Sequence, residues 1–218
     1  ARVTGRPVKL RLPRRADMTA TGKRHPFLYR WTAGFDDAGR ITALDATLAA
    51  DGGWSADMSG GVVFRAVTHA LNCCDVPDVR ITGCAVKTNT VSHTAFRGFG
   101  GPQGALLMED VVHRVAHAVG LPPEEVRARN FVGAPGNGGE TSYGQPLEGD
   151  LIARVWAEAR ADSEWDRRRG EIAAFNASHP TLRRGLGSTV LAFGISFGIV
   201  HLNQAGALVH VYSDGSIR

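Results

Sequence analysis

The sequence predicts an α+β fold, in which antiparallel hairpins and a mixed sheet pack against helices. Two patterns carry this prediction. Strand-like stretches at residues 25–35 and 40–50 flank a turn signal at residues 36–39, and residues 103–119 place apolar side chains at helical spacing. The composition agrees, because 43% hydrophobic and 21% charged residues are close to the globular average and exclude a disordered chain.

The first half of the chain is expected to alternate strands with one short helix. Residues 14–22 form a polar connection, residues 60–70 form the short helix, and residues 88–101 have no regular period. The predicted strands cover four stretches: residues 6–13, 25–35, 40–50 and 77–87.

The second half contains the clearest helix, over residues 103–119. Pro102 near its start and Gly120 after its end stand where these residue types fit best. A glycine-rich loop is expected over residues 133–147. The other predicted elements are a short helix at 122–129, one long or two broken helices at 150–176, a buried strand at 186–199 and a further strand at 203–212.

Both ends of the chain suggest that it is part of a longer polypeptide. It does not begin with Met, and it stops just after a hairpin turn signal at residues 213–216. A strand that enters a hairpin needs a partner. We therefore expect the chain to be truncated at both ends and to self-associate through residues 205–212.

Charge and cysteine content exclude several classes of protein. The net charge of +4 is small and the basic residues form no stripe with aromatics, so no nucleic-acid partner is expected. No apolar run is long enough to cross a membrane. The cysteines, Cys73, Cys74 and Cys84, form no C-x-x-C pair, which argues against a zinc or iron–sulfur site within the chain. Free thiols favour a cytoplasmic location.

Residues 94–103 (T-A-F-R-G-F-G-G-P-Q) are the segment most suggestive of chemistry. Glycines surround Arg97 and Phe99 just before the long helix, and glycine lets the backbone come close to a ligand. The helix N-terminus beyond them offers free N–H groups to an anion. A tight connection between a strand and a helix explains the same residues without a ligand. The pattern is no P-loop, because the Lys-Ser/Thr ending is absent.

This segment resembles the signature of the xanthine dehydrogenase/xanthine oxidase family of molybdenum hydroxylases. The resemblance extends over the whole chain, since several separated blocks match in the same order. These blocks are residues 21–27 (T-G-K-R-H-P-F), 64–66 (F-R-A), 121–127 (L-P-P-E-E-V-R), 193–197 (F-G-I-S-F) and 202–207 (L-N-Q-A-G-A).

The resemblance implies a role for each matched residue. Arg97 would lie at the molybdenum–pterin centre, near the metal but not as a direct ligand. Phe99 and Phe197 would hold the two faces of a purine, and Arg65 would contact it and steady charge on its carbonyl oxygen. The position after Phe197 is usually Thr in the vertebrate-like enzymes and is Gly198 here, which puts one substrate hydrogen bond in doubt.

The implied activity is oxidation of hypoxanthine to xanthine and of xanthine to urate, with water as the oxygen source. Residues 1–218 would form a partial molybdopterin-binding domain, with iron–sulfur clusters and FAD on other domains or subunits. No catalytic residue is expected within the chain, because the resemblance places the base farther downstream. Alone, the chain is expected to bind no molybdenum cofactor and to be inactive.

Two alternatives remain open. An aldehyde oxidase-like hydroxylase would act on aldehydes or other N-heterocycles with the same cofactor. A non-catalytic module would retain only the fold. Taken without the resemblance, Arg65 is an ordinary exposed or ion-paired arginine, and Phe99 and Phe197 are ordinary core residues.

Overall fold

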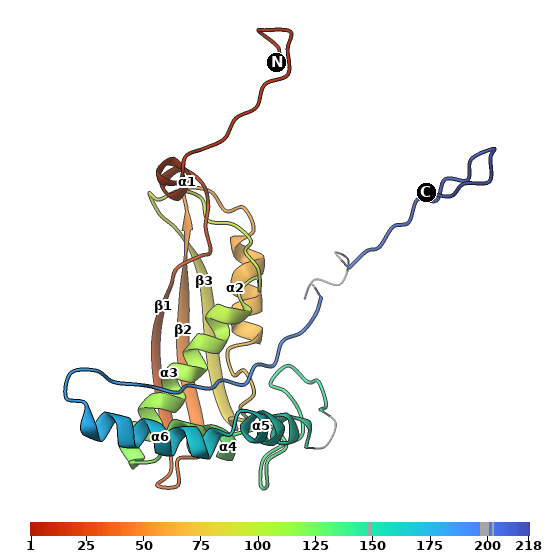
Figure 1. Cartoon of the computed structure of the whole chain (residues 1–218). Coiled ribbons are helices and arrows are strands. Elements are labelled where there is room, and N and C mark those ends of the chain that lie inside the picture. Colours follow the sequence, from red (N-terminus) through yellow and green to blue (C-terminus); the bar gives the residue numbers. More distant parts are fainter. Residues whose placement is uncertain (148–149, 197–200, 202) are drawn as a thin grey trace.

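A three-stranded mixed sheet forms the centre of the fold (Figure 1). Its strands are β1 (Phe27–Phe35), β2 (Ile41–Gly53) and β3 (Asp78–Lys87), with β2 in the middle. Strand β1 pairs with β2 in antiparallel fashion, and β3 pairs with β2 in parallel. This structure, a computed structural model, describes residues 1–147, 150–196, 201 and 203–218. The predicted α+β class and mixed sheet are confirmed.

The β1–β2 hairpin is closed by the side chain of Asp36. Its Oδ1 atom accepts hydrogen bonds from the backbone N–H groups of Ala38 (3.0 Å) and Arg40 (2.8 Å). Gly39 has φ +78°, which a glycine adopts without strain. An aspartate that folds the chain back in this way is a common hairpin device. The predicted turn at residues 36–39 is therefore confirmed.

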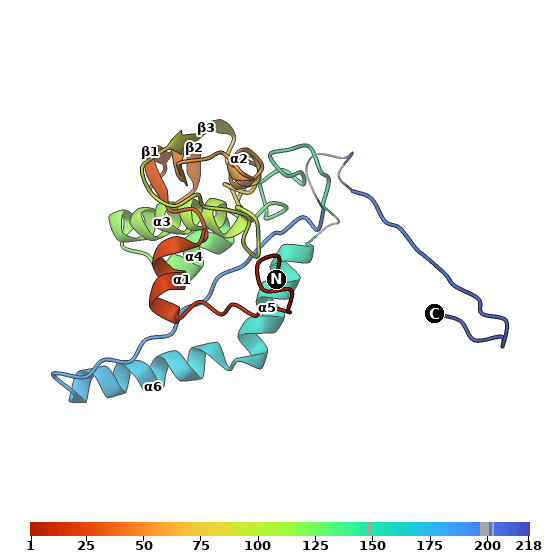
Figure 2. The same ribbon diagram turned by 90° about the horizontal axis from the view of Figure 1, so that it is seen from above.

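Two helices cover one face of the sheet (Figures 1 and 2). Helix α2 (Ser59–Thr68) connects β2 to its parallel neighbour β3, and α3 (Gly101–Val119) lies beside it. A parallel pair of strands requires such a crossover connection, which is commonly a helix. The opposite face of the sheet is exposed, as shown by Leu28 on β1 and Cys84 on β3, which flank Ala49 of β2.

The main core lies between this sheet and the two helices. Strand β2 alternates buried and exposed residues, as a strand with one covered face should. Helix α3 contributes side chains spaced three and four residues apart, which form one apolar stripe. The buried residues of β2 and α3 that meet here are Leu44, Ala46, Leu48, Leu107, Met108, Val111, Val112 and Val115.

The remaining helices are α1 (Arg14–Ala20), α4 (Pro123–Arg129), α5 (Leu151–Asp162) and α6 (Trp165–Ser178). The predicted helical region at 150–176 is thus two helices. The break falls at Glu164, whose φ of +49° interrupts the helical backbone. A second small core joins α5 to the chain after α4, where the rings of Phe131 and Trp156 meet edge to face at 5.9 Å.

Three predicted elements are wrong, and each error has a physical reason. Residues 6–13 form no strand, because no neighbouring strand lies beside them and Val8 and Leu10 stay exposed. The polar connection at 14–22 contains α1, since its Arg, Ala and Met residues are good helix formers. In the described part of residues 186–199 the chain is extended but unpaired, and most of its side chains are exposed or half-buried.

The C-terminal segment extends away from the body of the molecule (Figures 1 and 2). Its predicted turn at 213–216 is present. The backbones of His210 and Arg218 exchange two hydrogen bonds of 2.9 and 3.0 Å, and a single bridge joins Val211 to Ile217. The predicted strand at 203–212 is otherwise absent from its described residues. Within the part of the chain that the structure describes, no helix has the length and apolar character needed to cross a membrane.

Candidate functional site

The glycine-rich loop before α3 turns sharply at three consecutive residues. Gly98, Phe99 and Gly100 all have positive φ, of +95°, +49° and +102°. Only glycine adopts this region readily, so the two glycines permit the turn and Phe99 is held in it by its surroundings. The loop delivers the chain to the N-terminus of α3 at Gly101.

Two glycines let the start of α3 come very close to α2. A Cβ atom at Gly100 would lie 2.1 Å from the carbonyl oxygen of Val62, and one at Gly104 would lie 2.3 Å from that of Ala66. Such distances are far inside van der Waals contact. The sequence pattern of the loop therefore serves close packing between helices as well as the turn itself.

Phe99 and Arg65 both lie along α2. The Phe99 ring lies 3.1 Å from the position that a Cβ atom would occupy at Gly61, one helical turn before Arg65. Arg65 is only 8% exposed, which is low for an arginine. Its Nη1 atom donates to the carbonyl oxygen of Gly194, and its guanidinium lies 5.2 Å from the centre of the Phe193 ring.

Arg97 lies on the outer side of the same loop, with an exposed side chain. Its carbonyl oxygen accepts a 2.6 Å hydrogen bond from Nη2 of Arg24. The Arg24 guanidinium also lies 4.6 Å from the centre of the Phe96 ring. Phe96 is 54% exposed.

The structure thus places Arg65 on α2, Phe99 against the same helix at Gly61, and Arg97 on the exposed side of the adjoining loop. Phe197 and Gly198 lie outside the described residues. Whether all five predicted site residues share one pocket therefore stays a prediction.

Sequence reasoning missed two polar residues that continue the line of Arg65. His69 and Asn72 follow it at spacings of four and seven residues, as residues on one helix face would, but His69 is the C-cap of α2 and Asn72 lies in the turn after it. Both bond to the backbone of residues 190–194, more than one hundred residues away. The spacing of His69 and Asn72 from Arg65 was a signal in the sequence. Their hydrogen bonds to backbone atoms more than one hundred residues away leave no pattern in the sequence.

His69 and His25 are buried histidines whose pKa values are lowered from 6.5. Burial is the main cause for both, since it disfavours the charged imidazole. The Arg65 guanidinium adds to the effect at His69, and His93 adds to it at His25. His25 bonds to the Ser59 hydroxyl through Nε2 at 2.8 Å.

We expect the free energy of unfolding to fall as the pH drops below about 6.5. With folded pKa values below 6.5, the unfolded chain binds protons more readily, so this stability is fully present above pH 6.5 and is lost toward the folded pKa values. A hydrogen bond from Thr88 is the main reason that the pKa of Asp51 is lowered from its usual 3.8. The stability that the Asp51 carboxylate contributes is therefore lost only below pH 3.8. Urea unfolding at several pH values measures the effect. His69→Gln should reduce the loss, and the exposed His117→Gln should not.

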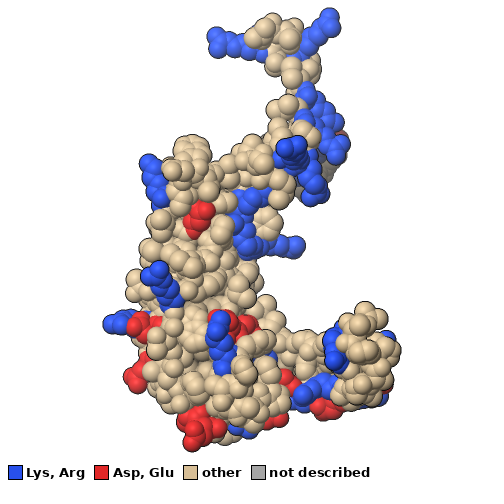
Figure 3. Space-filling view, turned by 90° about the vertical axis from the view of Figure 1, so that its left-hand side faces the viewer, with Lys and Arg blue, Asp and Glu red and all other residues tan. Residues whose placement is uncertain are grey.

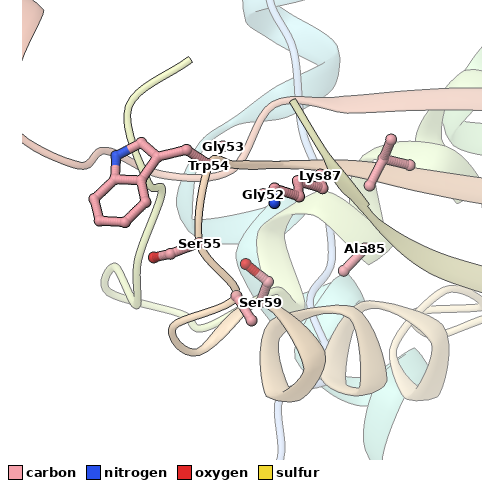
Figure 4. A pocket seen from close by; sticks show the side chains of 9 residues that line it. Gly52, Gly53, Trp54, Ser55, Ser59, Ala85 and Lys87 are labelled. Atoms are coloured by element: carbon pink, nitrogen blue, oxygen red, sulfur yellow. The ribbon is translucent and has the colours of Figure 1, made fainter. Parts of the chain in front are cut away.

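Two cavities lie near this region. A pocket of about 150 Å³ opens at the ends of β2 and β3, where Gly52, Gly53, Ser59 and Lys87 line it (Figure 4). A larger one of about 420 Å³ is lined mostly by apolar side chains, among them Leu151 and Phe193. Arg65, Arg97 and Phe99 are absent from the described residues that line either cavity.

The loop also has the chemistry that suits a polar, anionic cofactor. Nη1 of Arg24 is buried and has no hydrogen-bond partner among the described residues, and it lies 3.8 Å from the position of a Cβ atom at Gly98. Figure 3 shows Lys and Arg side chains along the N-terminal end of the molecule. Guanidinium groups beside a glycine backbone are suited to bind phosphate or similar oxyanions.

Together, the short mixed sheet, the two closely packed helices and the glycine-framed loop between arginines define a cofactor-binding domain of the α+β class. The chain belongs to the molybdopterin cofactor-binding domain family. Profiles described as molybdopterin cofactor-binding domain match residues 1–131 and 158–218.

Comparison with individual proteins gives high similarity over a short share of each. The chain is 46% identical to xanthine dehydrogenase/oxidase of Felis catus over 214 residues, which are 98% of this chain and 16% of that protein. It is 41% identical over 219 residues to nicotinate hydroxylase of Emericella nidulans, covering 100% of this chain and 16% of that protein. The chain therefore spans about one sixth of the length of these relatives.

A solved structure agrees. The aldehyde oxidoreductase from Desulfovibrio desulfuricans ATCC 27774 superposes with a TM-score of 0.65 at 29% identity. The match covers 77% of this chain and 18% of that chain. The resemblance predicted from the sequence is confirmed, and with it the molybdopterin cofactor of this domain family.

Proposed function

We propose that this chain is part of a longer molybdenum hydroxylase that oxidises purines, converting hypoxanthine to xanthine and xanthine to urate. The similarity to a xanthine dehydrogenase/oxidase over 98% of the chain supports the chemistry. The observation that carries the purine assignment is Arg65, a buried and permanently charged guanidinium on α2, one turn from Gly61, where the Phe99 ring packs. An aldehyde has no distant carbonyl for such a group to contact.

The chain's own residues would bind and orient rather than transfer the proton. Arg97 and Arg24, with the backbone at Gly98 and Gly100, would hold the molybdopterin cofactor at the start of α3. When bound, the cofactor supplies a molybdenum centre that accepts the two electrons removed from the substrate as an oxygen from water is added. Iron–sulfur clusters and FAD on other domains or subunits would carry these electrons away.

Arg65 and the aromatic rings would act on the substrate. Negative charge develops on the exocyclic oxygen of a purine as its ring is hydroxylated, and a fixed guanidinium stabilises it. Phe99, and Phe197 from outside the described residues, would hold the flat faces of the ring. Gly198 offers no hydroxyl in place of the usual Thr, so one contact to the substrate would be missing. We place the catalytic base outside this chain.

An aldehyde oxidase-like activity is the second candidate. The superposition with an aldehyde oxidoreductase and the identity to a nicotinate hydroxylase favour it over a non-catalytic module. The test is to purify the full-length protein that contains this chain, measure its molybdenum content, and compare turnover of xanthine and benzaldehyde. Faster turnover of xanthine supports the purine assignment. Turnover of benzaldehyde alone would support the second candidate, and a metal-free, inactive protein would support the module.

We also propose that the isolated chain self-associates through residues 205–212. Leu208, Val209 and Val211 are 65–79% exposed on an extended segment. Exposed apolar strands with free backbone groups tend to pair with other molecules. Sedimentation velocity over a range of concentrations should show dimers or larger species, and Val209→Lys should shift the chain toward monomer. A monomeric profile at high concentration would contradict the proposal.

A further inference from the structure

Three side chains, Arg65 of α2 and His69 and Asn72 just after it, hold an extended segment that comes from the other end of the chain. Asn72 donates from Nδ2 to the carbonyl oxygen of Val190 (2.6 Å) and accepts at Oδ1 from the N–H of Ala192 (3.0 Å). His69 and Arg65 bond to Gly194. The bonded residues, 190, 192 and 194, alternate along the segment as on one edge of a strand. Side chains from the end of α2 and the turn after it thus replace the neighbouring strand that this segment lacks.

The Gly194 peptide is gripped from both sides. Its N–H donates to Nε2 of His69 at 3.1 Å, and its carbonyl oxygen accepts from Nη1 of Arg65. The Nδ1 atom of His69 lies 3.1 Å from the carbonyl oxygen of Arg65, so Nδ1 must carry the proton and Nε2 must accept. The imidazole is therefore neutral with one defined tautomer. It connects the carbonyl oxygen of Arg65 to the N–H of Gly194, and the carbonyl oxygen of Gly194 in turn accepts from the Arg65 side chain.

Phe193 seats the segment between the two helices. Its ring fills the space that a side chain at Gly101 would occupy, since a Cβ atom there would lie 2.4 Å from Cε2 of Phe193. The ring centres of Phe193 and His69 are 5.4 Å apart, and those of His69 and Tyr143 are 6.1 Å apart. The Arg65 guanidinium lies over Phe193. The position of this guanidinium thus depends on where residues 192–194 lie.

We propose that His69 and Asn72 are positioning residues that set substrate specificity by fixing Arg65. They hold the backbone of residues 190–194, and that backbone holds Nη1 of Arg65; among the described residues no hydrogen bond to its other nitrogens is found, so these could meet a substrate carbonyl. The inference rests on the proposed function, because it assumes that Arg65 meets the carbonyl of a purine. It predicts that loosening the segment harms substrates with a distant carbonyl and spares those without one.

The test uses the full-length protein with three substitutions. His69→Phe keeps an aromatic ring but removes the acceptor for the Gly194 N–H. His69→Gln restores an acceptor, and His117→Phe is the matched control at an exposed position on α3. We expect kcat/KM for xanthine to fall about tenfold in His69→Phe, the size of one lost hydrogen bond to a buried group, with benzaldehyde changed less than about twofold. His69→Gln should recover most of the loss.

A second measurement is independent of catalysis. Hydrogen exchange of peptides covering residues 190–195 should become faster in His69→Phe and in Asn72→Ser, and remain at the wild-type rate in His117→Phe. Unchanged exchange across this segment, or an equal fall for both substrates, would overturn the inference. Faster exchange in a protein that oxidises neither compound would instead support the contact and overturn the proposed function.

Discussion

Replacing Arg65 with Ala in the full-length protein should lower kcat/KM for xanthine by about 10²–10³-fold, the usual loss when a donor to a developing oxyanion is removed. Turnover of benzaldehyde should stay within about threefold of the wild type. The expectation follows from the burial of Arg65, which keeps its charge in a region where water screens it little. Steady-state kinetics with both substrates measure the effect.

Two controls separate charge from packing. Arg65→Lys keeps a cation but loses the planar fork, so we expect xanthine turnover between the values of the wild type and the alanine variant. Arg114→Ala removes an arginine from the exposed side of α3, where it pairs with Asp110, and should change neither substrate. Undiminished xanthine turnover in Arg65→Ala would end the purine role of this residue, and an equal fall for both substrates would point to damage to the fold.

Local patterns in the sequence predicted the central part of the fold well. The hairpin depends on a turn residue, Asp36, whose side chain acts within four positions of itself. Helix α3 depends on apolar spacing within one segment. Both signals are local, so the sequence contains them in full.

The failures involve contacts between distant segments. Residues 186–196 have the small apolar composition of a buried strand, yet whether they pair depends on which backbone is available beside them. In this structure the side chains of His69 and Asn72, at the end of α2, make hydrogen bonds with the backbone N–H and C=O groups of this segment. Residues 6–13 alternate as a strand should but have no neighbour. Periodicity predicts a tendency to form a strand, whereas pairing is decided elsewhere in the molecule.

The candidate site shows the same division. The glycines in residues 94–103 predicted that the backbone of this loop comes close to another group, such as a ligand. The structure shows such a close approach, and the group approached is the backbone of α2. Arg65 and Phe99 came from the family resemblance; Arg65 lies on that helix, and Phe99 packs against it at Gly61. Nothing local indicated that Gly194 would occupy one nitrogen of Arg65. Helix α2 therefore contacts both the signature loop, at Gly61 and Val62, and the segment at 190–194, at Arg65.

The closeness of α3 to α2 makes Gly100 highly sensitive to an added methyl group. A Cβ atom there would lie 2.1 Å from the carbonyl oxygen of Val62 and 3.0 Å from the backbone nitrogen of Ala66. Neither backbone atom can move without shifting α2. The φ of +102° is also strained for any residue with a Cβ atom. Steric overlap and backbone strain thus add at this one residue.

Gly100→Ala should therefore lower the free energy of unfolding by about 3 kcal/mol or more, combining the usual cost of an overpacked site with that of a strained backbone. Urea unfolding followed by circular dichroism measures it. Gly170→Ala is the matched control, because Gly170 lies exposed within α6 with no atom near its Cβ position and should gain up to about 1 kcal/mol from better helix propensity. A loss below about 1 kcal/mol at Gly100 would show that α3 can move away from α2, and the contact of Phe99 with α2 at Gly61 would then not be fixed by the backbone.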